Sequence, residues 1–285
     1  MTLNSDFNNQ IQEIIKNAIR EDVGSGDHSS LACIPSTTTG KAKLLIKDTG
    51  ILAGVHFAKA VFNFVDPDLK METFINDGDT ISYGDTAFTV SGSSLSILKA
   101  ERLVLNTMQR MSAIATKTKT LVDLVAGTNT KILDTRKTTP NLRILEKWAV
   151  KIGGGHNHRF GLYDMIMLKD NHIDFCGGIT KALQKTKAYL KVNNLDLKII
   201  VEARDLKEIQ EILEAGGVYR ILIDNFSPEE TLKAIELIAG RCLTESSGGI
   251  DQTNIRQYAK CGVDYISSGA ITHSVHNLDL SLKAM

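Results

Sequence analysis

Polar residues crowd one twenty-residue stretch of the chain, GGGHNHRFGLYDMIMLKDNH, at positions 153–172. Three histidines, an arginine, a lysine and two aspartates surround the apolar run MIML. Histidine and aspartate bind zinc, a lysine at the end of an apolar strand can form a Schiff base, and arginine with lysine binds anions. The stretch by itself is compatible with all three kinds of site.

Each kind of site makes a different use of these side chains. A zinc site would use the three histidines with Asp164, but Arg159 and Lys169 in the same stretch would repel a dication. A Schiff base would use Lys169 and leave the other cations without a task. An anion site accounts for the largest number of residues, namely Arg136, Lys137, His158, Arg159 and Lys169.

The chain after residue 130 alternates between apolar and amphipathic segments. The apolar segments predict strands over residues 131–135, 164–170, 197–204, 220–225, 241–249 and 263–270. Helices are predicted between them, near residues 140–151, 178–192, 205–216, 228–239 and 251–261. Near-continuous apolar strands that alternate with helices indicate a parallel sheet covered by helices. Because no G-x-G-x-x-G follows a strand, an α/β barrel with fewer than eight strands is favoured over an open dinucleotide-binding sheet.

Polar residues lie at the carboxyl end of each predicted strand, and α/β barrels carry their chemistry at this end of the strands. They are Thr135, Arg136 and Lys137; Lys169; Glu202 and Arg204; Asp224 and Asn225; Glu245 to Gly249; and Ser267 to Ala270. Two carboxylates, Glu202 and Asp224, among several cations are typical of a site for a polyanionic substrate with a divalent metal. The late SSGG and SSGA segments predict backbone amides close to a phosphate.

The first 130 residues have a different texture. Apolar residues on one helical face predict a helix over residues 7–20, and the segment EDVGSGDHSS at 21–30 is expected to be a loop. Short apolar runs between residues 40 and 92 predict a small sheet with a helix over 56–64 beside it. Residues 95–126 predict one long or kinked helix.

The overall composition excludes several classes of partner. Lys and Arg total 33, as do Asp and Glu, so the chain has no global positive field for nucleic acid or a membrane surface. No apolar run approaches the roughly 18 residues that span a bilayer, and the first residues lack the pattern of a secretory signal. The four cysteines have no C-x-x-C spacing. These features predict a cytoplasmic protein with reduced thiols and no nucleic-acid or membrane partner.

Several motifs together resemble one enzyme family. The block ILDTRKTTPNLRILEKWAVKIGGGHNHRFGLYDMIMLKDNHI is similar almost throughout to the central signature of the quinolinate phosphoribosyltransferases, also called carboxylating nicotinate-nucleotide pyrophosphorylases. So are EDVGSGDHSS, KAERLVLN, ILIDNF, ESSGGI and GVDYISSGAITHS. The similarity covers essentially the whole chain. Ser29 and Ala203 depart from the family's usual residues, and neither belongs to the charged set.

The resemblance implies a fold, a reaction and an assembly. The fold is an N-terminal α/β sandwich domain over residues 1–112 and an incomplete C-terminal α/β barrel over 113–271, with residues 272–285 packing back on the first domain. The reaction, a step of de novo NAD biosynthesis, transfers phosphoribosyl from phosphoribosyl pyrophosphate to quinolinate. It releases pyrophosphate and CO2 and leaves nicotinate mononucleotide. The resemblance also implies Mg²⁺ without an organic cofactor, and a homodimer with shared active sites.

Roles for individual residues also come from the resemblance. Arg102 would reach into the partner's barrel and contact a quinolinate carboxylate. Quinolinate and the phosphates would be held by Thr135, Arg136, Lys137, His158, Arg159 and Lys169. Phosphate would also be cradled by Ser247, Gly248, Gly249, Ser268, Gly269 and Ala270, with His273 close by. Glu202 and Asp224 would contact the ribose hydroxyls or, partly through the substrate's phosphates, the metal.

The implied catalytic residues are Lys137, Lys169, Glu202 and Asp224, whereas His156 and His172 receive no role. Two other interpretations stay open. One is a paralogue on the same scaffold, of the molybdenum-transport-associated type, with another anionic substrate. The other is a Schiff-base barrel of the aldolase type, which would use Lys169.

Overall fold

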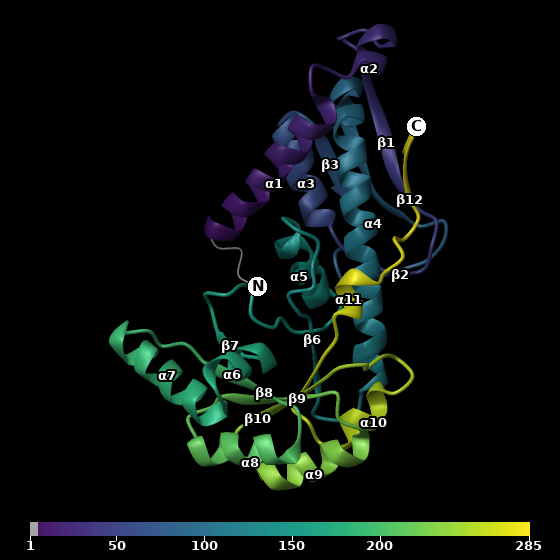
Figure 1. Ribbon diagram of the computed structural model, residues 1–285. Helices are drawn as coiled ribbons and strands as arrows, with labels where there is room; N and C mark the ends of the chain where they lie inside the picture. Colours follow the sequence, from purple (N-terminus) through teal and green to yellow (C-terminus); the bar gives the residue numbers. More distant parts are fainter. Residues whose placement is uncertain (1–4) are drawn as a thin grey trace. The chain divides into compact units, whose positions relative to one another are not determined.

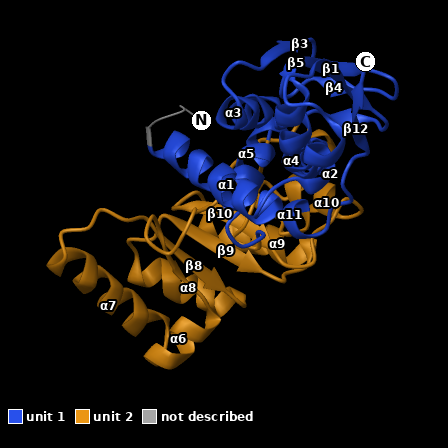
Figure 2. Ribbon diagram, turned by 90° about the horizontal axis from the view of Figure 1, so that it is seen from above, with its two compact units in different colours: residues 1–119, 138–154, 271–285 blue, residues 120–137, 155–270 orange. Residues whose placement is uncertain are grey.

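The computed structural model describes residues 5–285, and the chain divides into two compact units (Figure 2). Unit 1 consists of the residues up to 119, residues 138–154 and residues 271–285, and unit 2 of residues 120–137 and 155–270. The chain therefore passes from one unit to the other several times, and the units are not joined by a single linker. Within the described residues, no helix is long and apolar enough to cross a membrane.

Unit 1 contains an antiparallel sheet in which the last strand of the chain pairs with the first (Figure 1). Its order is β12-β1-β5-β3, formed by β1 (Thr39–Ile46), β3 (Lys70–Thr73), β5 (Thr86–Ser93) and β12 (Leu280–Ala284). Ala42, Leu44 and Ile46 of β1 are buried at every second position, as expected of a strand with one face on a core. A short pair is formed by β2 (Gly50–Ile51) and β4 (Thr80–Ile81).

The helices before residue 130, and two later helices that belong mainly to unit 1, largely agree with the sequence pattern. They are α1 (Ser5–Val23), α2 (His28–Cys33), α3 (Val55–Val65), α4 (Ser94–Leu124), α5 (Arg143–Ile152) and α11 (Ala270–His273). The expected loop was wrong at residues 28–30, which open α2, because Asp27 caps this helix by accepting a hydrogen bond from the Ser30 amide at 3.1 Å. The boundary expected between residues 112 and 113 lies inside α4, which is one unbroken helix.

Unit 2 is built on a sheet of six parallel strands. These are β6 (Lys131–Leu133), β7 (Ile166–Leu168), β8 (Ile199–Ala203), β9 (Arg220–Asp224), β10 (Leu243–Ser247) and β11 (Tyr265–Ser267). Their order is β6-β11-β10-β9-β8-β7, so the first two strands in sequence form the two edges. This order confirms the expected α/β barrel with fewer than eight parallel strands.

Helices cover the outer face of this sheet because the apolar strand residues need a second layer. The helices are α6 (Asp170–Cys176), α7 (Ile179–Val192), α8 (Leu206–Ala215), α9 (Pro228–Ile238) and α10 (Ile255–Lys260). Val201 and Ile223 of the strands belong to one buried core with Leu183, Ile209 and Ala234 of the helices, and Figure 1 shows α8 and α9 along the sheet. The predicted helices are confirmed, whereas α6 was not predicted.

Candidate active site at the carboxyl ends of the parallel strands

The carboxyl ends of the strands in unit 2 bring together polar side chains from separate parts of the chain. The register of neighbouring strands pairs Glu202 of β8 with Leu222, and Asp224 of β9 with Ser247 of β10. Lys169, directly after β7, places its Nζ 3.7 Å from Glu202 Oε2, and its charge also acts on Asp224. One lysine and two carboxylates thus meet at the end of the sheet where the sequence predicted them.

The two carboxyls lie in a setting that disfavours their charged form. Burial raises the pKa of Glu202 and of Asp224 above their usual values. A hydrogen bond from the Asp170 amide, 3.3 Å from Glu202 Oε1, and the charge of Lys169 oppose this rise at Glu202. Lys169 and the side-chain amide of Asn225, 2.6 Å from Asp224 Oδ2, oppose it at Asp224. Such a carboxylate pair stabilises a positive group beside it strongly, because little water screens the charges.

Residues 5–285 contain no group of three or more His, Cys, Asp and Glu side chains arranged to hold a metal, which argues against the zinc interpretation. His172 instead accepts a hydrogen bond at Nδ1 from the Lys169 amide, at 3.0 Å, and caps the start of α6. His156 pairs through its backbone with β6, and its side chain is exposed. Glu202 and Asp224 offer hard oxygen ligands, which suit Mg²⁺ because this ion takes only one or two protein carboxylates.

Two arginines at the strand ends lie close enough to influence each other. Arg159 is 7% exposed, and burial together with the nearby charge of Arg136 lowers the pKa of its guanidinium. Its Nη1 donates to the Met165 carbonyl at 3.2 Å. The Lys137 amide donates to Thr135 Oγ1 at 2.9 Å, a local turn that leaves the Lys137 side chain exposed. Two like charges held together in a protein are stabilised by a bound anion, so this part of the site fits an anionic ligand.

The ring of His158 faces protein groups at both nitrogens. The Arg159 amide donates to His158 Nδ1 at 2.7 Å, and His158 Nε2 lies 3.3 Å from Glu245 Oε2. Accepting this hydrogen bond at Nδ1 favours the tautomer that carries its proton on Nε2. The contact of His158 with a substrate stays a prediction.

Asp134 organises this part of the site and was not singled out in the sequence. It is fully buried directly after β6. Its Oδ1 accepts the His158 amide at 2.8 Å, and its Oδ2 accepts the Asn157 side-chain amide at 2.6 Å. An aspartate placed between a buried strand and a run of polar residues is the signal that could have identified it.

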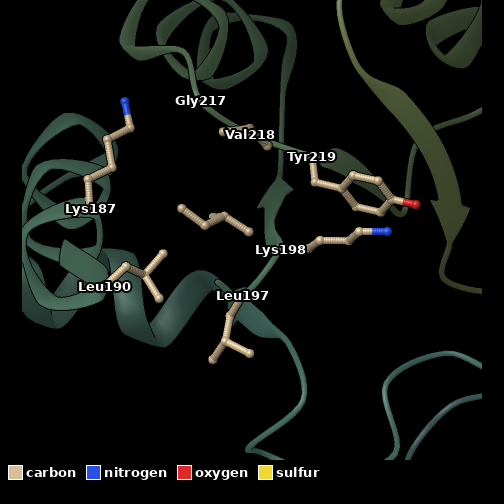
Figure 3. A pocket seen from close by; sticks show the side chains of 8 residues that line it. Lys187, Leu190, Leu197, Lys198, Gly217, Val218 and Tyr219 are labelled. Carbon is tan, nitrogen blue, oxygen red and sulfur yellow. The ribbon is translucent and has the colours of Figure 1, made fainter. Parts of the chain in front are cut away.

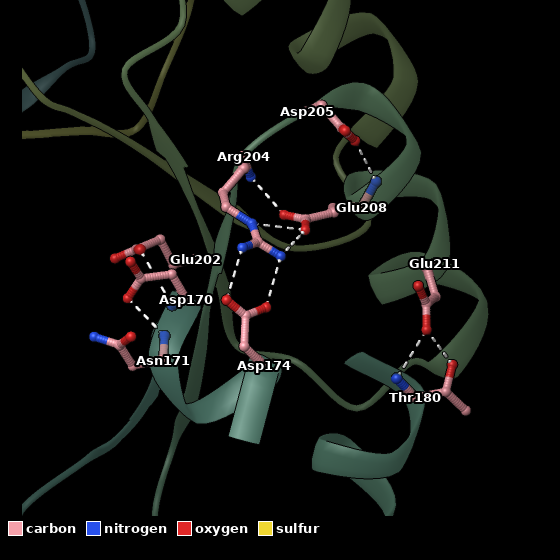
Figure 4. A network of polar contacts seen from close by, with 9 residues as sticks. All are labelled: Asp170, Asn171, Asp174, Thr180, Glu202, Arg204, Asp205, Glu208 and Glu211. Atoms are coloured by element: carbon pink, nitrogen blue, oxygen red, sulfur yellow. Dashed lines mark hydrogen bonds and ion pairs between the residues drawn. The ribbon is translucent and has the colours of Figure 1, made fainter. Parts of the chain in front are cut away.

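Arg204 follows β8 but is engaged by two acidic side chains (Figure 4). Its Nη1 and Nη2 each donate to a carboxylate oxygen of Asp174 at 3.1 Å, and its Nε and Nη2 donate to Glu208 Oε1 at 2.8 and 2.6 Å. These hydrogen bonds, from Glu208 first, raise the pKa of Arg204. Arg204 therefore joins the last turn of α6 to the first turn of α8 and is neutralised there.

The two glycine-containing segments differ in how their backbone is used. The Ser268 amide donates to the Leu133 carbonyl at 3.0 Å, so it belongs to the sheet and is not available to a phosphate. The Asn225 amide donates to the Ser247 carbonyl at 2.9 Å and joins the SSGG segment to the loop after β9. Phosphate binding by the remaining residues of the two segments, including Gly269 and Ala270, stays a prediction.

Replacing Gly248 with alanine is expected to cost more stability than replacing Gly249. Gly248 has a φ of +91°, and a Cβ there would lie 2.9 Å from the Asn225 backbone nitrogen and closer still to its side chain. Gly249 has a φ of +61° and open space for a Cβ. We expect Gly248→Ala to lower the free energy of unfolding by about 2–3 kcal/mol and Gly249→Ala by about 1 kcal/mol. Urea unfolding of both variants checks this, and equal losses would contradict it.

Arg102 and His273 are the predicted site residues that lie in unit 1. Arg102 is exposed on α4. His273 is exposed at the end of α11, where its Nδ1 lies 2.7 Å from Ser274 Oγ. All other predicted site residues belong to unit 2.

A separate cavity of about 480 Å³ opens where α7 meets the amino ends of β8 and β9 (Figure 3). Its walls include Leu190, Leu197 and Val218, and Lys198 Nζ lies 4.2 Å from the centre of the Tyr219 ring. The cavity lies at the opposite end of the strands from Glu202 and Asp224. It contains none of the predicted site residues and is not the candidate active site.

Two family models match most of the chain. The model described as "Quinolinate phosphoribosyl transferase, C-terminal domain" matches residues 114–283, and the model of the N-terminal domain of the same family matches residues 27–112. Together they include parts of both units and every residue of the candidate site.

Curated proteins and solved structures show the same similarity. The chain is 47% identical over 288 residues to the chloroplastic nicotinate-nucleotide pyrophosphorylase [carboxylating] of Arabidopsis thaliana, covering 96% of this chain and 82% of that protein. It is 38% identical to a probable enzyme of the same name from Bacillus subtilis, covering 96% and 93%. The crystal structure of NadC from Streptococcus pyogenes matches with a TM-score of 0.91 and 42% identity, covering 96% of this chain and 95% of that chain.

Proposed function

We propose, from the premise that this chain belongs to the quinolinate phosphoribosyltransferase family, that the strand ends of unit 2 form its active site. The enzyme transfers phosphoribosyl from phosphoribosyl pyrophosphate to quinolinate with decarboxylation, in NAD biosynthesis. The products are nicotinate mononucleotide, pyrophosphate and CO2. The observation that carries the site assignment is the lysine–carboxylate group of Lys169, Glu202 and Asp224, on which the charge of Lys137 also acts. The pair of neighbouring arginines, Arg136 and Arg159, lies at strand ends of the same unit.

Quinolinate carries two adjacent carboxylates, and its recognition requires cations in a fixed arrangement. Arginine suits this task because its planar guanidinium binds a carboxylate through two parallel hydrogen bonds. Arg159 is buried and held by the Met165 carbonyl, so little conformational entropy is lost when it binds. We assign Arg136 and Arg159 to the quinolinate carboxylates on these grounds.

The transfer step separates charge between the ribose and the leaving group. As the bond between C1 of the ribose and the pyrophosphate breaks, positive charge develops on the ribose and negative charge on the pyrophosphate. Glu202 and Asp224 would stabilise the ribose and hold its hydroxyls, and Lys137 and Lys169 would stabilise the anions. The catalytic contribution of these residues is therefore electrostatic and positional, and no side chain needs to act as a general acid or base.

Loss of CO2 follows from the product of the first step. Once its ring nitrogen carries the ribose, the pyridine ring is cationic and stabilises the electron pair left on C2 when the 2-carboxylate departs as CO2. A proton from solvent then binds to C2 and gives nicotinate mononucleotide. This makes a Schiff base on Lys169 unnecessary, in agreement with the 3.7 Å contact that Lys169 makes with Glu202.

Mg²⁺ is expected to accompany phosphoribosyl pyrophosphate, whose pyrophosphate charge it would partly neutralise. Glu202 and Asp224 would hold the ion directly or through the substrate's phosphates. No organic cofactor is required, because the ribosylated ring itself takes up the electrons of decarboxylation.

The assembly and the compartment are further parts of the proposal. A homodimer would place Arg102 in the active site of its partner, which accounts for an exposed arginine on α4 in unit 1. The four cysteines are free thiols, which suits a reducing compartment such as the cytoplasm. The relative from Arabidopsis thaliana is named as chloroplastic and one from Nicotiana tabacum as mitochondrial, so fluorescence microscopy of the tagged chain in its own cell is the direct test.

Product formation tests the proposed function. The purified protein, incubated with quinolinate, phosphoribosyl pyrophosphate and Mg²⁺, is expected to yield nicotinate mononucleotide and CO2 in equal amounts, measured by chromatography and by release from carboxyl-labelled quinolinate. Chelation of the metal is expected to stop the reaction. Absence of product under these conditions would contradict the proposal, and turnover of nicotinate in place of quinolinate would indicate a transferase without decarboxylation.

A further inference from the structure

Three ionisable side chains lie in contact inside unit 2. The mechanism described above gives no role to two of them, Arg220 and Glu245. Arg220 opens β9, Glu245 lies in the middle of β10, and His158 precedes β7. Their exposed fractions are 5%, 0% and 8%. Arg220 Nη1 lies 2.6 Å from Glu245 Oε2, and the same oxygen lies 3.3 Å from His158 Nε2. We name these residues the barrel triad.

The charge state of the barrel triad follows from its contacts. Burial by itself would raise the pKa of Glu245, but His158 and Arg220 hold it below the usual value, so Glu245 is ionised. The guanidinium of Arg220 balances this charge and stacks on an aromatic ring, with Cζ 4.4 Å from the centre of Tyr265. In the triad the anion Glu245 is therefore paired with the cation Arg220, and the imidazole of His158 lies beside this pair.

Burying such a set of charged groups in the interior of a barrel is energetically unfavourable. Apolar side chains of similar volume are often as stabilising as a buried ion pair, or more so, because no charge has to be removed from water. Stability alone therefore does not explain why an arginine and a glutamate occupy these positions. The orientation that they impose on His158 does explain it.

The hydrogen bonds of His158 show what is oriented. Its Nδ1 accepts the Arg159 amide at 2.7 Å, which favours a proton on Nε2, the nitrogen that lies 3.3 Å from Glu245 Oε2. The ring is held from both sides, by Glu245 inside the barrel and by the backbone of Arg159 at the strand ends. Arg159 is the buried arginine whose guanidinium is held by the Met165 carbonyl.

We propose that Glu245, held by Arg220, is a positioning residue for quinolinate, because it orients His158 and through it the backbone and guanidinium of Arg159. This inference rests on the proposed function for the identity of the substrate. It assigns Glu245 no contact with substrate. Binding of phosphoribosyl pyrophosphate, which we assign to other strand ends, is expected to be independent of the triad.

The decisive variant removes both charges of the buried pair together. In Glu245→Gln alone, Arg220 keeps an uncompensated buried charge, so a loss of activity could reflect a damaged fold. In the double variant Glu245→Leu with Arg220→Met, both charges are absent, and the melting temperature is expected to return close to that of the unaltered enzyme. Thr231→Val, at a fully buried position on α9, serves as a control for a core substitution.

The positioning role predicts that the double variant changes the KM values for the two substrates to different extents. We expect KM for quinolinate to stay raised by about tenfold or more, corresponding to about 1.4 kcal/mol of lost binding, while KM for phosphoribosyl pyrophosphate stays within about twofold. A merely structural role predicts that both KM values recover together with stability, and that result would overturn the inference.

A spectroscopic measurement tests the geometry without any substrate. In the enzyme with ¹⁵N-labelled histidine, the His158 ring, assigned by comparison with His158→Gln, is expected to show a protonated Nε2 and an unprotonated Nδ1. In the double variant no carboxylate faces Nε2 and only the Arg159 amide orients the ring, so the share of the other tautomer is expected to rise. A protonated Nδ1 in the unaltered enzyme would contradict the inference, whereas lack of quinolinate turnover beside the expected tautomer would contradict only the proposed function.

Discussion

Replacing Lys169 with methionine is expected to lower kcat/KM for phosphoribosyl transfer by about 10²- to 10³-fold. The substitution keeps most of the volume and removes the ammonium group that lies 3.7 Å from Glu202 Oε2. It also leaves Glu202 and Asp224 without the neighbouring cation that opposes the effect of their burial. Steady-state kinetics with each substrate varied in turn measure the loss.

The same variant has an expected pH dependence with a definite sign. Burial raises the pKa of Glu202 and of Asp224, and Lys169 lowers it in both cases. Without Lys169 both pKa values rise further, the carboxylates take up protons at higher pH, and the acid limb of kcat/KM moves to higher pH. Carboxyls whose pKa is higher in the folded than in the unfolded state lose stability as the pH rises through that interval, so the variant should lose more stability there than the unaltered enzyme.

Lys185→Met is the matched control, because Lys185 is an exposed lysine of α7 in the same unit. It should leave both the rate and the acid limb unchanged. An acid limb that stays in place in Lys169→Met would show that the lysine does not act on the carboxylates. Borohydride treatment in the presence of substrate is expected to leave no adduct on Lys169, and a trapped adduct would restore the Schiff-base interpretation.

Replacing Arg102 with alanine is expected to reduce kcat/KM for quinolinate by about 10²- to 10³-fold while the fold stays intact. Arg102 is exposed on α4, so its truncation leaves no buried group unpaired. The loss arises because the proposed dimer supplies this guanidinium to a carboxylate of quinolinate in the partner's site. Far-UV circular dichroism and thermal unfolding check the fold, and the product assay measures activity.

Mixing subunits separates a shared site from a site within one chain. Arg102→Ala and Lys169→Ala are each expected to be inactive, and in a mixed dimer one site receives both unaltered residues. After complete exchange, about a quarter of all sites should be active. If exchange is confirmed by mass spectrometry of tagged subunits and activity stays at the level of the single variants, Arg102 is not shared. Lys99→Ala, an exposed lysine on the same helix, is the control for the effect of mixing.

Much of the fold could be predicted because local sequence patterns have local causes. The parallel strands and most helices were visible as apolar runs and amphipathic periods. The helix α6 was missed because it has only seven residues and begins with the polar run DNH, and its start depends on His172 accepting the Lys169 amide. The start of α2 was missed for a similar reason, since one hydrogen bond to Asp27 decides it.

The sequence predicted which residues form the candidate site, but it did not predict which of their charges are neutralised by neighbouring residues. The sequence identified Lys169, Glu202 and Asp224 from their places after apolar strands, and the structure brings these side chains together. Glu208 is four residues after Arg204 and could be paired with it from the sequence, but nothing in the sequence shows that Asp174 of α6 also binds Arg204. The reason is that ion pairs form between segments that only the folded chain places side by side.

What the sequence determined by itself is the family, the reaction and the order of elements, because motifs and hydrophobic periods depend on neighbouring residues. Only the tertiary structure decided that His158 lies between the Arg159 amide and Glu245. The groups that face the two nitrogens of an imidazole determine where its proton lies, and Glu245 is remote from His158 in the sequence, so no local pattern reveals this contact.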